Sequence, residues 1–346
     1  MEVKYAELPV RDLHVVYLSA PNIRLGECLL LLHFYKRSPI RYVILFIKIN
    51  MFYASLFFLC TFCCQFLVEA TSSQCSLAPE DFEWPSQFVR SGAANIRVLV
   101  QGSGPAVVII PSYGRDGGDD FNRISSALVE AGYLVLRPQP RGTLGSTGPM
   151  QNVTAANLAA DIAEVIDTLA GGQAVVMGHA FGTLVAKVAA ANYPEKIPAM
   201  ILASSGGLHV PDNIAQMPFI AGNTSLPIAT RLAALQLAFF APNHDAHIWL
   251  DGWFPDTLEM EHTAVESVPS LSAIWGGANT TQILQLIPAD DPLLPPDQWN
   301  QTTGVFPDRA VSIIIEDASH ALFPEQNQAV DDAILPWLAQ QSSRLG

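Results

Sequence analysis

The sequence has few cysteines, and nearly all of them lie near its start. Of the five cysteines in 346 residues, four precede residue 70 (Cys28, Cys60, Cys63 and Cys64), and only Cys75 follows. A disulfide needs two cysteines and a cysteine metal site needs several, so the chain beyond residue 70 has neither an intramolecular disulfide framework nor a cysteine metal site. We expect no metal and no cofactor.

Basic residues are also scarce. The chain carries 18 Lys and Arg against 32 Asp and Glu, a formal net charge of −14. A surface with this charge repels phosphate groups, which argues against nucleic acid and anionic lipid as partners. The expected partner is a small-molecule substrate or ligand, and no protein partner follows from the sequence.

Charged residues are missing from one long stretch near the N-terminus. Residues 49–68, INMFYASLFFLCTFCCQFLV, contain no charge and are long enough to cross a bilayer. The small-residue sequence VEA at 68–70 resembles a signal-peptide cleavage site. Two interpretations remain open for residues 51–70. Residues 51–70 are either a signal peptide or a signal anchor. In the first case residues 1–50 are an extension of the gene model, and in the second they are a cytosolic N-terminus. We favour the first, a secreted protein, over a type II membrane-anchored one.

Glycosylation sequons are present in the part of the chain that would enter the secretory pathway. Four Asn-x-Ser/Thr sequences occur, at Asn152, Asn223, Asn279 and Asn300. Such sites are modified only in a secretory lumen, so they agree with the interpretation of the leader.

Strand-like and helix-like segments alternate from residue 95 onward. The predicted strands are 95–100, 106–111, 133–138, 173–178, 199–204, 281–288 and 310–317, and the predicted helices are 120–132, 154–172 and 324–341. This alternation predicts an α/β fold with a mostly parallel twisted sheet and helices on both faces. The expected order is a connector (71–94), a first core part (95–207), a helical cap (208–280) and a second core part (281–346). The cap is predicted because the alternation gives way there to Pro, Met and aromatic residues with short helical pieces.

The stretch AVVMGHAFGTLVAKVAA, residues 174–190, predicts a strand, a tight turn and a helix. Gly178 and Gly182 would let the strand and the helix approach closely, and the side chain of the middle residue would project above the sheet. This arrangement usually exposes a nucleophilic serine. Here the middle residue is Ala180, which has no hydroxyl and cannot form an acyl-enzyme.

Two further polar residues follow predicted strands. Asp291 follows the strand at 281–288 and His320 follows the strand at 310–317. The carboxyl ends of strands in an open α/β sheet border the crevice where ligands bind, so both side chains are candidates for the site. Asp290 competes with Asp291 as the partner of His320. We prefer Asp291, because its place four residues before Pro295 matches the D-x-x-x-P spacing of the family that these segments resemble.

Together these segments resemble the α/β-hydrolase fold superfamily of esterases, lipases and lyases. The resemblance covers about residues 95–340 and rests on VVIIPSYGRDGGDDF, LVLRPQPRGTLGST, VVMGHAFGTLVAKVAA, PADDPLLPP and DASHALFPEQ. It implies a triad order in which Ala180 occupies the nucleophile position, Asp291 is the acid and His320 the base. It also implies an oxyanion hole formed by the backbone N–H groups of Tyr113 and Phe181, although PSYG stands where the family often has His-Gly.

Two functions of different classes remain compatible with this pattern. The first is an enzyme that uses a His–Asp pair and an oxyanion hole without a serine nucleophile, for hydrolase-like, lyase or isomerase/cyclase chemistry on a small hydrophobic, carbonyl-containing substrate. The second is a pseudoenzyme that binds a ligand in the capped pocket. The retained Asp and His favour the enzyme, because a receptor needs neither residue in its catalytic place.

The leader generates the first prediction. The mature protein should begin near Thr71 and carry N-linked glycan on at least one sequon, because VEA at 68–70 ends an uncharged run. Intact-mass analysis of the secreted form before and after endoglycosidase measures both properties. An unglycosylated cytosolic protein that begins at Met1 would contradict the prediction.

Overall fold

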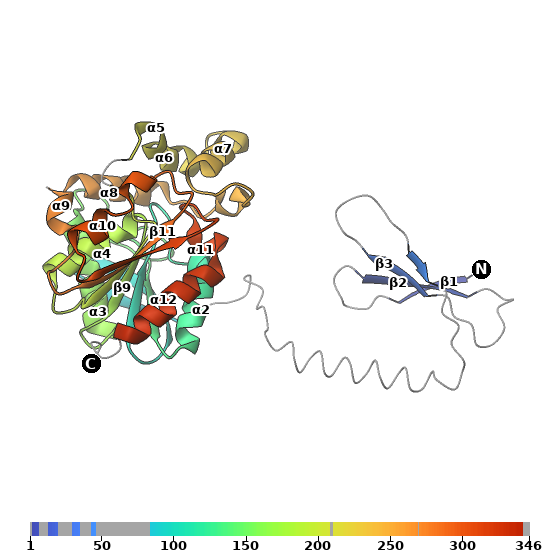
Figure 1. Cartoon of the computed structure of the whole chain (residues 1–346), viewed down its shortest axis with the longest axis horizontal. Helices are drawn as coiled ribbons and strands as arrows, with labels where there is room; N and C mark the ends of the chain where they lie inside the picture. The colour runs from blue at the N-terminus through green and yellow to red at the C-terminus, as the bar shows by residue number, and fades with distance from the viewer. Residues whose placement is uncertain are drawn as a thin grey trace. The chain divides into compact units, whose positions relative to one another are not determined.

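The computed structural model describes residues 2–6, 13–19, 30–34, 43–45, 84–207, 210–268 and 270–341, and the chain divides into two units, Met1–Ala78 and Pro79–Gly346 (Figure 1). In the first unit, four strands pair in the order β1-β2-β3-β4. They are β1 (Glu2–Ala6), β2 (Leu13–Ser19), β3 (Leu30–Phe34) and β4 (Val43–Leu45), and each pairs antiparallel with the next. The predicted leader (51–70), the five cysteines and residues 71–83 lie outside the described residues. Among the described helices, none is both long and apolar enough to cross a membrane.

The second unit is built on an eight-stranded sheet with the order β12-β11-β10-β9-β7-β8-β6-β5. Its strands are β5 (Ser86–Ser91), β6 (Ala94–Gly102), β7 (Ala106–Ile110), β8 (Leu134–Pro138), β9 (Val175–His179), β10 (Ala199–Ala203), β11 (Gln282–Pro288) and β12 (Ala310–Ile315). From β8 to β12 all neighbours are parallel, whereas β5 and β6 join antiparallel at one edge. The predicted fold class, a mostly parallel sheet with helices, is confirmed.

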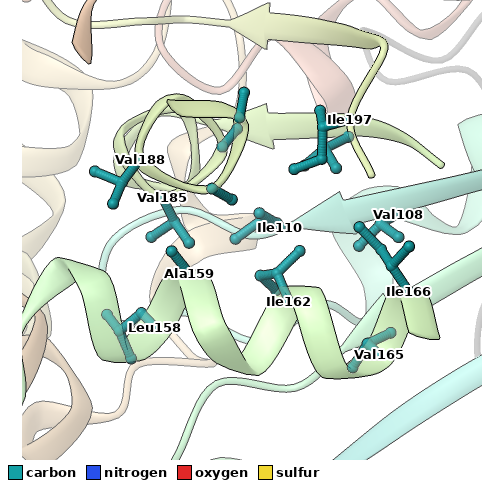
Figure 2. Packing of buried hydrophobic residues seen from close by; sticks show 14 of the residues in the cluster. Val108, Ile110, Leu158, Ala159, Ile162, Val165, Ile166, Val185, Val188 and Ile197 are labelled. Atoms are coloured by element: carbon teal, nitrogen blue, oxygen red, sulfur yellow. The ribbon is translucent and has the colours of Figure 1, made fainter. Parts of the chain in front are cut away.

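Helices cover both faces of this sheet. Side chains of α3 (Ala155–Leu169) and α4 (Phe181–Asn192) pack on one face, and those of α2 (Asn122–Glu130) and α12 (Asn327–Gln341) pack on the other. Every residue of β7, β9 and β10 is buried, as expected for central strands covered on both sides. Figure 2 shows Leu158, Ile162 and Ile166 of α3 among the buried side chains on the face that α3 and α4 cover.

Local sequence signals set the ends of α3. Thr154 caps the helix by accepting a hydrogen bond from the backbone N–H of Asn157, and the Asn157 side chain accepts one from the Thr154 N–H. This capping box pairs backbone donors that the first helical turn leaves free. The helix ends before Gly171 and Gly172, both of which have positive φ. The helix predicted over 154–172 is confirmed, with its helical residues at Ala155–Leu169.

One strand was not foreseen. Strand β5 lies within 71–94, the stretch interpreted as a connector, and pairs with β6 at the sheet edge. Only two of its six residues, Val89 and Ser91, are buried. A polar edge strand of this length carries little apolar alternation, so its sequence resembles that of a linker.

The segment predicted as a cap contains five helices and one 3-10 turn within its described residues. They are α5 (Asp212–Ala215), α6 (Met217–Gly222), α7 (Ile228–Ala238), η3 (Ala246–Trp249), α8 (Pro255–Glu266) and α9 (Leu271–Ile274). The elements from α5 to η3 share their own apolar cluster, which includes Leu235 and Trp249. In contrast, Met260 and Ala264 of α8 belong to the core under the sheet. Helix α8 is therefore part of the main core in packing terms.

Four short elements remain. They are η2 (Asp119–Phe121), which directly precedes α2, η4 (Pro296–Gln298) and α10 (Gln301–Val305), which stand between β11 and β12 in the chain, and α11 (Leu322–Glu325), which follows β12.

A lysine is buried within α4. Lys187 is 3% exposed, and its Nζ donates to Ser205 Oγ at 2.9 Å and lies 3.8 Å from the ring centroid of Trp275. No carboxylate among the described residues forms an ion pair with it. Burial lowers the pKa of Lys187 to about 7, because the charged ammonium loses its hydration.

Lys187 generates a prediction on the pH dependence of stability. Its pKa is near 10.5 when unfolded and about 7 when folded, so between these values the unfolded state binds more protons. The penalty of burying Lys187 is therefore greatest below pH 7 and fades as the pH rises to 10.5. Replacing Lys187 with Met should stabilise the fold by roughly 2–4 kcal/mol at pH 6 and by much less at pH 9.5. Chemical denaturation across this pH range measures the difference.

Lys196→Met is the matched control. Lys196 pairs with Asp167 on the surface, and the hydrogen bond to Asp167 raises the pKa of the ammonium. Lys196 therefore stays charged across the tested range, so its replacement should change stability by the same amount at each pH. A Lys187→Met effect that is equally independent of pH would contradict the prediction.

Candidate active site

The turn between β9 and α4 holds Ala180 in a strained conformation. Ala180 has φ 52° and ψ −113°, a region that L-residues rarely adopt, and its backbone N–H donates to the carbonyl of Ala203 at 2.9 Å. The two flanking glycines allow the close approach. A Cβ at Gly178 would overlap the carbonyl of Gly182, and a Cβ at Gly182 would overlap that of Ile110 and lie 2.7 Å from that of Pro111. The sequence therefore places a tight elbow here, with a methyl group at its tip.

Asp291 and His320 come together from two different strand ends. His320 Nδ1 lies 2.9 Å from Asp291 Oδ2, and both residues are buried. The other carboxylate oxygen of Asp291 accepts the N–H of Leu293 at 2.9 Å. Asp290 is exposed, so Asp291 is the partner of the pair. Because Nδ1–H donates to the carboxylate, the lone pair of the imidazole is on Nε2.

The residue before Ala180 holds the backbone of His320. His179 Nε2–H donates to the carbonyl of His320 at 2.7 Å, and the hydroxyl of Ser204 donates to the same carbonyl at 3.1 Å. The His179 ring is fully buried and contacts Phe121 and Phe323 edge-on. Burial, and secondarily the charge of His320, lowers the pKa of His179 to about 3, so the ring is a neutral donor. This role of His179 and Ser204 was not foreseen from the sequence.

A carboxylate joins the His320 loop to the cap. Glu325 accepts the N–H of Ser319 through Oε2 and the N–H of Ala241 through Oε1, both at 2.6 Å. Burial raises the pKa of Glu325, and the two backbone donors oppose that rise. Next to this link, the ring of Phe239 lies 5.6 Å from that of His320. The cap therefore meets the site at the His320 loop.

Tyr113 and Phe181 lie side by side. Their rings meet edge-on with centroids 5.0 Å apart, and Phe181 is the first residue of α4. Within the described residues, neither backbone N–H has a hydrogen-bond acceptor. Two free N–H groups next to the elbow are what an oxyanion hole requires, one of them at a helix N-terminus.

The four sequon asparagines, Asn152, Asn223, Asn279 and Asn300, are all exposed.

The sheet order, the crossover helices and the position of the site at the strand ends define a protein with the α/β-hydrolase fold. The model of the family described as alpha/beta hydrolase fold matches residues 105–249. Over these residues the chain is similar to this family, and solved structures share the fold.

Several proteins similar to this chain are named as hydrolases. A 2-hydroxy-6-oxononadienedioate/2-hydroxy-6-oxononatrienedioate hydrolase of Burkholderia vietnamiensis is 30% identical over 155 residues, which are 43% of this chain and 49% of the relative. The chain thus matches about half of the length of that protein. An epoxide hydrolase of Caballeronia sordidicola is 29% identical over 125 residues, 36% of each chain. The esterase EaEST of Exiguobacterium antarcticum superposes with a TM-score of 0.62 at 18% identity, over 74% of this chain and 100% of that one.

The elbow generates a prediction on stability. Gly182→Ala should destabilise the fold by roughly 2–4 kcal/mol, because the new methyl group would overlap backbone carbonyls that cannot move aside. Gly304→Ala is the matched control, since a Cβ there meets nothing within 4 Å and the residue lies in α10. Equilibrium denaturation measures the free energy of unfolding of both variants. Equal stability of the two proteins would mean that the elbow is less tightly packed than described.

Proposed function

We propose that this protein is an enzyme that acts on a small, hydrophobic, carbonyl-containing substrate without forming a covalent intermediate. The observation that carries the proposal is the hydrogen bond between His320 and Asp291, both buried, in a site whose nucleophile position is alanine. Without a hydroxyl at Ala180, the residues that remain to do chemistry are a general base and the backbone donors of an oxyanion hole.

In this proposal, His320 Nε2 is the proton acceptor. It takes a proton from a water molecule or from a carbon acid of the substrate, and Asp291 stabilises the imidazolium that forms. When water is the donor, its oxygen bonds to the carbonyl carbon and the π electrons move to the carbonyl oxygen. The N–H groups of Tyr113 and Phe181 then stabilise that oxyanion. The same groups would stabilise an enolate in lyase or isomerase/cyclase chemistry.

The relatives support the carbonyl class of substrate. The Burkholderia protein is named for the hydrolysis of two oxo-dioates, compounds with a ketone and two carboxylates. These compounds are substrates in the name of that protein. For the present protein, the name supports only a carbonyl as the reacting group. The cap aromatic Phe239 beside His320 supports a hydrophobic substrate.

We further propose that the site works in the secretory pathway or outside the cell. Support comes from the uncharged leader and from the exposure of all four sequon asparagines.

The missing hydroxyl generates the decisive prediction. Ala180→Ser should place a nucleophile within reach of His320 and confer hydrolysis of small aryl esters, at least about 100-fold above the wild type. The same variant should react covalently with an organophosphonate. The wild type should hydrolyse these esters little or not at all and should not be labelled, because it lacks the nucleophile. Ala180→Ser/His320→Ala should do neither, because it lacks the base. Ester hydrolysis and mass-spectrometric detection of the adduct provide the measurements.

A native substrate would be sought by untargeted metabolite turnover with the wild-type protein. His320→Ala should abolish that turnover, whereas a ligand-binding pseudoenzyme would show only a modest loss of affinity. A folded but inert Ala180→Ser protein would favour the pseudoenzyme, since the base or the hole would then be nonfunctional. Covalent labelling of the wild type would mean that another residue is the nucleophile.

A further inference from the structure

The cap helix α8 bonds directly to the loop that carries Tyr113. The N–H of Gly114 donates to Oε2 of Glu261 at 2.6 Å, and the carbonyl of Gly114 accepts the N–H of Phe254 at 2.9 Å. The next residue along the helix, His262, has its Nδ1 3.1 Å from the hydroxyl of Tyr113. Both polar groups of Gly114 and the side chain of Tyr113 are thus bonded to one short part of the chain.

Packing reinforces these bonds. Gly114 has φ +62°, and a Cβ there would lie 2.7 Å from the Cβ of Leu258, so the helix touches the loop backbone. Two hydrogen bonds of 2.9 Å hold helix α8 near its ends. The Thr257 hydroxyl donates to the carbonyl of Arg141, and Ser267 Oγ accepts the N–H of Ala155. The loop therefore rests on a helix that is fixed to the core.

Glu261 is the buried polar group at the centre of this contact. It is 2% exposed and borders a cavity of about 40 Å³ between β7, α3 and α4, which Pro111 and Phe181 also line. The charged and titratable groups that face it are Tyr113 and, across the cavity, the ion pair of Arg141 with Asp161. Glu259, His262 and Glu266 lie on its own helix and are exposed.

Burial raises the pKa of Glu261 to about 8, and the hydrogen bond from Gly114 opposes that rise. Burial, and secondarily Glu261, also raises the pKa of Tyr113. The carboxyl is therefore uncharged at neutral pH. It can hold the Gly114 N–H without placing a negative charge beside the hole, whereas its ionised form would oppose an oxyanion there.

We propose that Glu261 is a positioning residue for the oxyanion hole, in that its carboxyl group, supplied by α8, holds the Tyr113–Gly114 backbone. The proposal rests on the function proposed above, because it assumes that the Tyr113 N–H stabilises an oxyanion. It adds that α8, which lies in the segment predicted as a cap and packs on the core, contributes to the hole.

The first arm of the test measures the hole in the Ala180→Ser background. Adding Glu261→Ala should slow organophosphonate labelling and lower kcat for an aryl ester by about 10- to 100-fold, with KM changed less than about threefold. Adding Glu261→Gln should retain most of the activity at pH 7, because its amide oxygen still accepts the Gly114 N–H. Glu259→Gln, an exposed residue of the same helix, is the matched control and should have no effect.

The second arm measures the pH profile. In Ala180→Ser, labelling should fall by roughly tenfold as the pH rises from 7 to 9.5, because Glu261 ionises beside the hole. In Ala180→Ser/Glu261→Gln this decline should be absent. A purely structural role for Glu261 would leave the alkaline decline unchanged in the Gln variant, and this outcome would overturn the proposal even if Glu261→Ala failed to fold.

The third arm requires no activity. In the wild-type background, Glu261→Ala should increase hydrogen–deuterium exchange of the Gly114 amide by at least about tenfold, whereas Glu261→Gln should not. The proposal would be overturned if Glu261→Ala left the exchange of the Gly114 amide unchanged. It would also be overturned if this exchange increased while the labelling of Ala180→Ser/Glu261→Ala stayed undiminished. If Ala180→Ser itself were inert, the proposed function would fail and the catalytic role of Glu261 with it. Exchange at Gly114 would still decide whether Glu261 holds the loop.

Discussion

The close backbone contact at the elbow is the constraint on which the rest of the site depends. Helix α4 begins against the end of β7, with Gly182 next to the carbonyls of Ile110 and Pro111. This contact brings the loop that follows β7 to the first turn of α4, where Phe181 presents a free N–H. Any side chain at Gly182 would push the two elements apart, and the two backbone donors would separate with them.

Buried polar side chains then hold the backbone of the loops around the elbow. His179 and Ser204 hold the carbonyl of His320, Glu325 holds the N–H of Ser319, and Glu261 holds the N–H of Gly114. The two donors share the His320 carbonyl, and a buried backbone group left without any partner costs about 1–3 kcal/mol. The positions of the site groups are thus determined by main-chain contacts, which do not require a particular side chain at the tip of the elbow.

Much of the fold could be predicted from the sequence, because its signals are local. The apolar runs of the central strands and the cap at Thr154 each depend on neighbours along the chain. Asp291 was preferred to Asp290 on its spacing to a proline, and it is the residue that bonds to His320. Strand β5 was missed because it forms the polar edge of the sheet.

The supporting polar residues could not be identified, because their partners are distant in the sequence. A signal for Glu261, and for the buried Lys187 outside the site, was nevertheless present. Glu261 stands between Leu258 and Ala264 on the apolar side of α8, while Glu259 and Glu266 of the same helix are exposed. Lys187 is likewise the single charged residue of its helix. A lone ionisable residue at a core position of a helix is therefore a sign of a buried polar contact, although its partner follows only from the fold.

The strained turn at Ala180 has a physical reason to persist without a nucleophile. A non-glycine residue at φ 52° costs on the order of 1 kcal/mol or more, which an unused turn would have no cause to retain. This turn also directs the Phe181 N–H, at the positive end of the α4 dipole, to the space above the elbow. In the proposed mechanism that donor stabilises the oxyanion whether the attacking oxygen belongs to a serine or to water. Loss of the hydroxyl removes the covalent step, while the same backbone strain continues to serve the charge that develops on the substrate.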